Sequence, residues 1–259
     1  MQECGEKQIV WLCLFCATVG LAIESDNVVG YTIGTTGSDN NFVTVPFALV
    51  GFNTSDIQQI KLDDGGIGSI GWGTETFSVW EGVPTVATGS EFVYWDASMN
   101  PAGAEAGYFW GDENQAPATY SVAAGQAVVV NCGQDLAITI AGQVPTEGVS
   151  FVSIADNNFT GNPFPAAIDI QDISIDDGGA GSIGWGTETF SIWEGVPTVA
   201  EGSEFVYWDA SMNPDGSDAG CFWGDENQAK VTYSIPSGKG VVISCPAGLT
   251  VSIKSPYSL

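Results

Sequence analysis

The chain has 259 residues, of which 31 are Asp or Glu and five are Lys, with no Arg and no His, giving a formal net charge of −26 at pH 7. Because nucleic acids and anionic lipid surfaces are bound through clustered cations, this composition excludes both as partners. The lack of His also excludes Ser-His-Asp and Cys-His catalysis and histidine-ligated zinc, and the lack of Arg excludes bidentate phosphate clamps.

Residues 1–22 are expected to be a secretory signal peptide. The apolar run from Ile9 to Ala22 is short for a membrane span. Gly20 and Ala22 are the small residues that precede a cleavage site. An N-terminal membrane anchor is the alternative interpretation. No second apolar stretch of this kind follows, so we expect a secreted or cell-surface protein with no transmembrane span once the leader is removed.

The sequence after the leader contains one long internal repeat. A stretch of 54 residues that starts at Asp63 recurs from Asp176, an offset of 113 residues, with seven differences. Each copy with its flanks has the size of an independent domain rather than of a solenoid turn. Pro and Gly interrupt the chain at 143–148. We therefore predict two modules, at 23–144 and 145–259, each folded around its own apolar core.

The predicted elements within a copy are short strands joined by turns. In the first copy, residues 76–80, 91–96 and 136–140 alternate in side-chain character as strands do. Turn sequences rich in Gly, Pro, Asp and Asn recur at roughly eight to twelve residues, a spacing typical of antiparallel sandwiches. No segment after the leader shows extended helical periodicity. The predicted fold is all-β, with two tandem antiparallel β-sandwich modules after the signal peptide.

An acidic turn opens each copy and is a candidate calcium site. Calcium prefers carboxylate and carbonyl oxygens on flexible turns, and Gly permits tight turn geometry. An ordinary acidic turn at a strand end is the alternative. The candidate calcium ligands are Asp63, Asp64, Asp176 and Asp177.

Tryptophan is the most distinctive residue of the repeat, and two interpretations apply. The residues are Trp72, Trp80, Trp95 and Trp110, with Trp185, Trp193, Trp208 and Trp223 in the second copy. Most of them fill the sandwich cores, or some form a stacking surface for sugar rings. Flanking alternation predicts that Trp80 and Trp95 face the core, whereas Trp72, between two glycines, is the best exposed candidate. The candidate binding residues are Trp72, Trp110, Asn114, Trp185, Trp223 and Asn227.

Three cysteines lie beyond the leader, namely Cys132, Cys221 and Cys245. An odd count prevents complete pairing within one chain. Cys132 and Cys245 occupy equivalent repeat positions, whereas the counterpart of Cys221 is Tyr108. A disulfide between Cys221 and Cys245 is one hypothesis, and buried thiols that act as small apolar side chains are the other.

The stretches ESDNVVGY after the leader, NPFPAAIDIQDI in the second copy, and the closing LAITIAGQV and LTVSIKSP strands share a pattern. A Gly turn precedes an apolar strand, a short break and the closing strand. The pattern resembles a tandem β-sandwich module of secreted surface proteins from planctomycete- and verrucomicrobium-like bacteria, and it covers most of the mature chain. The resemblance implies an extracytoplasmic location and no known activity.

These observations favour a secreted, non-catalytic structural or adhesion protein of the cell surface or extracellular matrix. Glu91 and Asp96 lie on one predicted strand but point to opposite faces, so they do not form a glycosidase pair. The expected partners are other copies of the chain, other surface proteins or glycans. The alternative is a carbohydrate-binding protein that uses the exposed Trp of each copy.

Overall fold

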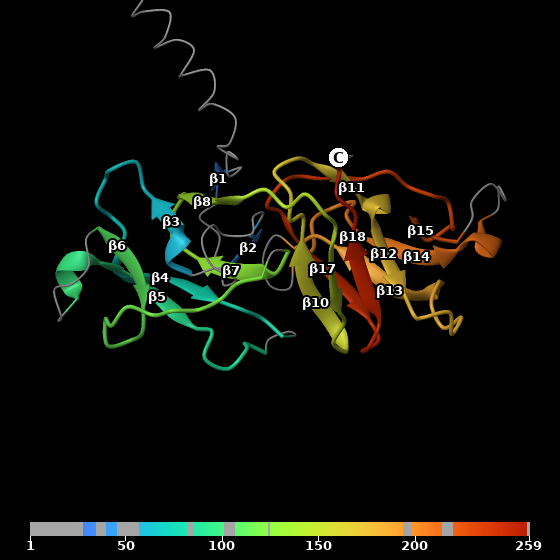
Figure 1. Cartoon of the computed structure of the whole chain (residues 1–259), viewed down its shortest axis with the longest axis horizontal. Coiled ribbons are helices and arrows are strands. Elements are labelled where there is room, and N and C mark those ends of the chain that lie inside the picture. The colour runs from blue at the N-terminus through green and yellow to red at the C-terminus, as the bar shows by residue number, and fades with distance from the viewer. Residues whose placement is uncertain are drawn as a thin grey trace, which may run out of the picture.

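The computed structural model describes residues 28–34, 40–45, 57–81, 85–100, 107–123, 125–193, 198–213 and 220–257. These residues form antiparallel β-strands and four one-turn 3-10 helices, with no α-helix among them (Figure 1). The all-β prediction is confirmed. The predicted signal peptide at 1–22 lies outside the described residues. No helix in the described part of the chain is long and apolar enough to cross a bilayer.

The first module is a sandwich of two antiparallel sheets. A three-stranded sheet has the order β1 (Val28–Gly34), β8 (Ala137–Gln143), β3 (Ile60–Asp63). A five-stranded sheet has the order β2 (Asn41–Thr44), β7 (Ala127–Asn131), β4 (Trp72–Ser78), β5 (Phe92–Asp96), β6 (Tyr108–Gly111). The 3-10 helices η1 (Ile57–Gln59) and η2 (Ala97–Met99) precede β3 and follow β5.

The second module repeats both sheets. Its three-stranded sheet has the order β9 (Val149–Val152), β18 (Thr250–Ile253), β12 (Ile173–Asp176). Its five-stranded sheet has the order β10 (Asp156–Gly161), β17 (Gly240–Cys245), β13 (Trp185–Ser191), β14 (Phe205–Asp209), β15 (Cys221–Gly224). A short pair, β11 (Ile168–Asp169) and β16 (Ser234–Ile235), and the 3-10 helices η3 (Ile170–Asp172) and η4 (Ala210–Met212) complete it.

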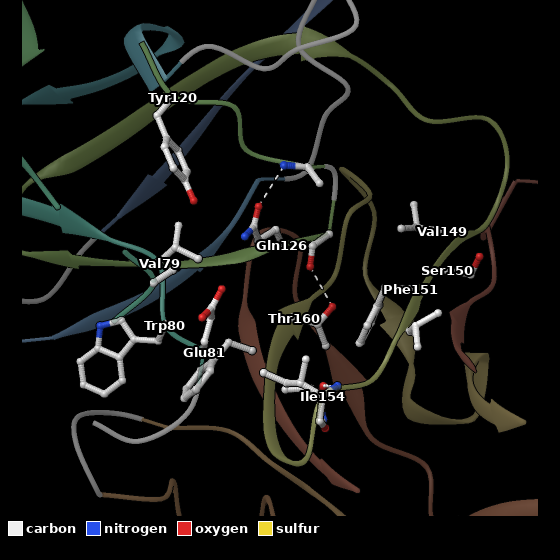
Figure 2. Close-up of a pocket in the computed structure, with 16 residues that line it drawn as sticks. Val79, Trp80, Glu81, Tyr120, Gln126, Val149, Ser150, Phe151, Ile154 and Thr160 are labelled. Carbon is white, nitrogen blue, oxygen red and sulfur yellow. Dashed lines mark hydrogen bonds between the residues drawn. The ribbon is translucent and has the colours of Figure 1, made fainter. Parts of the chain in front are cut away.

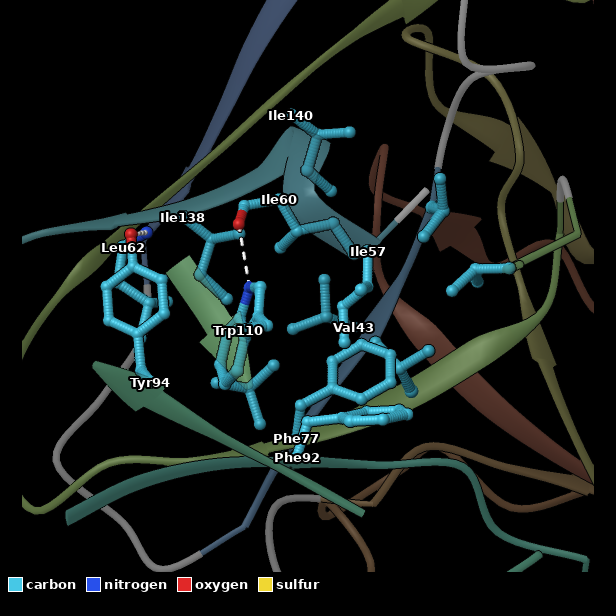
Figure 3. Packing of buried hydrophobic residues seen from close by; sticks show 14 of the residues in the cluster. Val43, Ile57, Ile60, Leu62, Phe77, Phe92, Tyr94, Trp110, Ile138 and Ile140 are labelled. Carbon is cyan, nitrogen blue, oxygen red and sulfur yellow. Dashed lines mark hydrogen bonds between the residues drawn. The ribbon is translucent and has the colours of Figure 1, made fainter. Parts of the chain in front are cut away.

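Each core lies between the two sheets of its module. In the first module Phe77, Tyr94 and Trp110 from the large sheet meet Ile60 and Ile138 from the small one (Figure 3). The indole Nε1 of Trp110 donates to the Ile60 carbonyl at 2.8 Å, and the Leu62 amide donates to the Tyr94 hydroxyl at 3.1 Å. These bonds satisfy the polar ends of buried aromatic side chains and fix one sheet against the other.

The side chains that point inward from the large sheet are not the ones that were predicted. Trp95 was expected in the core, but Phe92 and Tyr94 point inward and Trp95 lies half-buried on the outer face. The candidate binding residues Trp110 and Trp223 have no exposed surface, so the expectation that they bind a ligand is wrong. The error has a clear cause: both faces of β5 carry bulky apolar side chains, so alternation gives the period of the strand but not its inward face.

The two modules touch each other through a reciprocal aromatic cluster. Phe42 on β2 and Phe159 on β10 stack with ring centroids 5.7 Å apart and an interplanar angle of 11°. Trp80 and Trp193 pack edge-on or nearly so against both phenyl rings, with centroids 5.8 to 6.1 Å apart. Each module thus supplies one Phe and one Trp, an arrangement with approximate two-fold symmetry. Trp80, expected in a module core, belongs instead to this contact.

Backbone pairing reinforces the contact between the modules. The amide of Thr44 donates to the carbonyl of Gly238 at 2.9 Å, and isolated bridges join Val43 to Lys239 and Gln126 to Thr160. The Thr160 hydroxyl donates to the Gly125 carbonyl at 2.8 Å. The edge strands β2 and β10 therefore meet at the centre of the molecule, and β6 and β15 lie at its two ends (Figure 1).

Candidate functional site

A row of aromatic side chains crosses the outer face of each large sheet. In the first module Trp72 on β4 is the cross-strand partner of Trp95 on β5, which is in turn the partner of Phe109 on β6. Phe109 is buried and Trp95 is half-buried, whereas 58 % of the Trp72 side chain is exposed. We call Trp72 and Trp95, with their counterparts Trp185 and Trp208, the aromatic platforms.

Two glycines make room for the Trp95 ring. A Cβ atom added to Gly73, whose φ is +87°, would lie 2.8 Å from the Trp95 indole, and one added to Gly111 would lie 3.1 Å from it. The ring therefore lies flat against the backbone of β4 and β6. Gly73, the second glycine of the GWG motif, is needed for this close approach and for a positive φ that other residues rarely adopt.

Each platform ring is held by a hydrogen bond at its edge. The Nε1 of Trp72 donates to the carbonyl of Gly68 at 3.2 Å, and that of Trp95 donates to the carbonyl of Asp112 at 3.0 Å. These bonds use the one polar group of each indole and leave its apolar face as the contact surface. Fixed aromatic faces bind with little loss of conformational entropy.

The second module carries the same platform. Trp185 is 57 % exposed and is the cross-strand partner of Trp208. Their Nε1 atoms donate to the carbonyls of Gly181 and Asp225 at 3.1 and 2.9 Å. A Cβ added to Gly186 would lie 2.8 Å from the Trp208 ring. The predicted exposure of Trp72 holds in the structure, and its counterpart matches it closely.

A buried carboxylate that sequence reasoning missed supports each platform. Glu75 faces inward on β4 with 2 % of its surface exposed. Its Oε2 accepts the Gly71 amide at 3.0 Å, and its Oε1 accepts the Thr74 hydroxyl at 2.7 Å. Glu188 makes the same bonds in the second module. Because Gly71 directly precedes Trp72, this carboxylate fixes the irregular start of β4 on which the exposed ring stands. Its only sequence signal is an acid within a strand at an inward position.

The loop after β6 lies beside the platform and contains the candidate residue Asn114. The Oδ1 atom of Asp112 accepts the amides of Asn114 and Ala116, each at 2.9 Å. The bond from Ala116 is the largest influence on the pKa of Asp112, which these bonds hold below its ordinary value. The Asn114 side chain is exposed, and Asn227 occupies the same position in the second module. The Asn114 side chain bonds Asp112 within its own loop, and exposed amides of this kind suit hydrogen bonding to hydroxyl groups.

The aspartates of the acidic turns accept hydrogen bonds from residues of the same turn. Asp63 Oδ1 accepts the Gly65 amide at 2.8 Å, and Asp64 Oδ2 accepts the amide and hydroxyl of Ser69 at 2.6 and 2.9 Å. The Ser69 amide is the largest influence on the pKa of Asp64, which lies below its usual value. Asp176 and Asp177 repeat these bonds. Across the described ranges, no three Cys, Asp or Glu side chains gather as metal ligands, so the geometry gives the calcium interpretation no support.

The proposed disulfide between Cys221 and Cys245 is not formed. Both thiols are free, as is that of Cys132. Cys221 is on β15 and Cys245 is on β17, three strands apart in one sheet. Three strand spacings amount to roughly 14 Å, whereas the Cα atoms of a disulfide lie within about 7 Å of each other. The alternative, thiols packed among apolar side chains, describes the buried Cys245, and burial raises its pKa.

Comparison with protein families, curated proteins and solved structures gives no match for this chain. The function is therefore inferred from the surfaces of the molecule itself.

Proposed function

We propose that this chain is a secreted, non-catalytic adhesion protein that holds polysaccharide through two copies of the aromatic platform. The observation that carries the proposal is the duplicated exposure of Trp72 and Trp185, at 58 and 57 %. Exposed indole faces stack on the C–H faces of sugar rings, and the neighbouring Asn114 and Asn227 offer amide groups to hydroxyls.

The construction of the platforms supports a role beyond core packing. An indole left exposed in water contributes little to folding, because the hydrophobic effect rewards only surface that is removed from solvent. In each platform, nevertheless, a glycine leaves room for one ring and a backbone carbonyl accepts the N–H of each indole. A buried carboxylate also bonds the backbone just before the exposed ring. Such support fixes a binding surface in advance.

The position of the platforms in the molecule supports attachment to a repeating ligand. One platform lies on β4 and β5 and the other on β13 and β14, so each large sheet carries one platform. Two identical sites on one polymer raise the overall affinity by making the second contact intramolecular. The lack of His and Arg argues against catalysis by the common hydrolytic constellations.

The proposal is tested by titrating the full chain with soluble hexasaccharides of glucose, N-acetylglucosamine and xylose in a calorimeter. We expect saturable binding of at least one of them at two equivalent sites per chain. The double variant Trp72→Ala/Trp185→Ala should bind more than tenfold more weakly, as is typical when an aromatic anchor is removed.

The matched control is Ile67→Ala, because Ile67 is 80 % exposed and its counterpart in the second module is already Ala180. This variant should bind as the unaltered chain does. Binding to no hexasaccharide at millimolar concentration would refute the saccharide ligand. If the chain then self-associates and the double variant does not, the platforms serve self-assembly instead.

A further inference from the structure

A cavity of about 340 Å³ lies at the contact between the modules, away from the aromatic platforms (Figure 2). Residues 79–81, 87, 120, 123, 125 and 126 of the first module form one side, and residues between 149 and 160 of the second module form the other. The volume lies at the lower end of the range for small-molecule sites. Because both modules supply the wall, the cavity exists only while they are docked.

The wall of this cavity combines aromatic rings with one acid. Trp80, Tyr120, Phe151 and Phe159 contribute rings, and Glu81 is the single charged side chain among the described residues of the wall. The indole N–H of Trp80 is already donated to the Ser78 hydroxyl, at 3.0 Å. The ring faces carry partial negative charge, so both the aromatic and the acidic parts of the wall attract a cation.

Glu81 is exposed, and its charge acts on the Tyr120 hydroxyl in the wall of the cavity. In Figure 2 the Glu81 carboxylate and the Tyr120 hydroxyl lie on the same side of the cavity, with Phe151 and Thr160 across from them. Burial raises the pKa of Tyr120, and the charge of Glu81 raises it further. The nearby Thr160 hydroxyl donates to the Gly125 carbonyl, and Gln126 Oε1 accepts the Ala123 amide. The Glu81 carboxylate is thus the one charged group that a ligand would meet on the described wall, together with the polar groups of Tyr120 and Gln126.

Two exposed apolar side chains line the same cavity. Val152 is 68 % exposed and Ile154 is 43 % exposed, and both line the wall. Three other large apolar side chains are comparably exposed in the described part of the chain, and two of them are Trp72 and Trp185. Clustered apolar surface that the core does not use commonly marks a binding region.

We propose that this cavity binds an organic ammonium group joined to an apolar body, with the cation between the aromatic rings and Glu81 and the apolar part against Val152 and Ile154. A free arylalkylamine and a lysine side chain of a peptide offer the same chemistry. An anionic ligand would be repelled, because no described residue of the wall is basic. Bound ligand contacts both modules, so it stabilises their docked arrangement by mass action.

The test uses the full chain and two pairs of probes in a calorimetric titration. 2-Phenylethylamine is compared with neutral 2-phenylethanol, and a blocked Phe-Lys dipeptide is compared with its blocked Phe-norleucine counterpart. We expect at least one cationic probe to bind with 1:1 stoichiometry and at least about tenfold more tightly than its neutral partner, a difference of about 1.4 kcal/mol. The probe that binds more tightly identifies whether a free amine or a lysine side chain fits better.

Two variants and one control locate the site. Glu81→Gln should reduce the preference for the cationic probe to within about twofold without altering binding of the neutral one. Val152→Ser, which changes an exposed side chain, should weaken both. Glu91→Gln is the control, because Glu91 is an exposed acid of the same module outside the wall. Equal binding of cationic and neutral probes, no binding of any probe at millimolar concentration, or an equal effect of Glu81→Gln and Glu91→Gln would each overturn the proposal.

Discussion

Gly73 shows how a single residue permits a surface ring to lie flat. Its φ of +87° favours glycine, and an added Cβ would lie 2.8 Å from the Trp95 ring. Gly65 has a φ of +71° but no atom within 4 Å of such a Cβ. The two positions share a left-handed backbone conformation, in which any other residue would be strained, and only Gly73 is in contact with the ring. Substitutions at the two positions therefore separate the strain from the clash.

We expect Gly73→Ala to lower the free energy of unfolding by about 2–4 kcal/mol, combining left-handed strain with a clash. Gly65→Ala should cost only the strain, about 1–2 kcal/mol. Chemical denaturation of both variants checks this difference. Saccharide binding by the first module should be lost in Gly73→Ala and retained in Gly65→Ala. Equal stability of the two variants would contradict the flat packing of Trp95.

Tyr94 and Tyr207 make stability sensitive to alkali. Burial raises the pKa of each hydroxyl from 10.0 to about 12. Their neutral form is therefore favoured in the folded protein. The resulting stability is fully present below pH 10, the ordinary pKa, and is lost as the pH rises toward about 12.

We expect the free energy of unfolding to fall between pH 10 and 12 and to fall less steeply in Tyr94→Phe/Tyr207→Phe. Denaturant titrations across this range measure both slopes. The double variant will be less stable at neutral pH, because the amides of Leu62 and Ile175 lose their hydroxyl acceptors. An unchanged slope in the variant would show that other groups cause the alkaline loss.

At the scale of elements, the alternating segments predicted the strands well. Residues 76–80, 91–96 and 136–140 overlap β4, β5 and β8. The sequence did not show which face of β5 points into the core, because Tyr94 and Trp95 are both aromatic and only packing in the folded module decides between them. It also missed β2 and β10, whose residues lie where the repeat similarity fades.

The edge strands β2 and β10 fit each other through a difference between the two copies. Thr44 on β2 lies against Gly161 on β10, and a Cβ at Gly161 would overlap the Thr44 hydroxyl and the Lys239 carbonyl. The Thr44 hydroxyl donates to the carbonyls of Thr160 and Lys239, each at 3.3 Å. The Thr44 side chain on β2 therefore fills the space that Gly161, which has no side chain, leaves beside β10.

We expect Gly161→Ala to separate the modules and to disturb the end of β10 beside Lys239, while the core strands of both modules keep their fold. Hydrogen exchange should rise at Thr44 and Thr160 and stay unchanged in core strands such as β4 and β13. Gly133→Ala is the control, because an added Cβ there meets no atom within 4 Å. Retained protection at the contact in Gly161→Ala would show that the aromatic cluster alone holds the modules together.

At the scale of the whole molecule, the duplication predicted two like units but not their contact. Phe42 and Phe159 are 117 residues apart, whereas the main repeat has an offset of 113. Because the separation of this pair differs from the main offset by four residues, a comparison at the fixed offset does not align Phe42 with Phe159. The exposure of Trp72 was predictable from its flanking glycines. The docking of the modules, the buried Glu75 and the cavity between the modules depend on contacts between distant segments.

The central claim is that the two equal aromatic platforms of the docked modules act together on one polymer. Each platform alone supplies a weak contact, and the pair supplies avidity. The single variants Trp72→Ala and Trp185→Ala each leave one platform intact and should therefore behave alike.

The most direct measurement is the dissociation rate of the full chain and these variants from a surface coated with the polysaccharide that binds best. We expect each single variant to dissociate at least about tenfold faster than the unaltered chain, and the double variant to show no retention. Retention of either single variant equal to that of the unaltered chain, or loss in one single variant as complete as in the double variant, would contradict the claim.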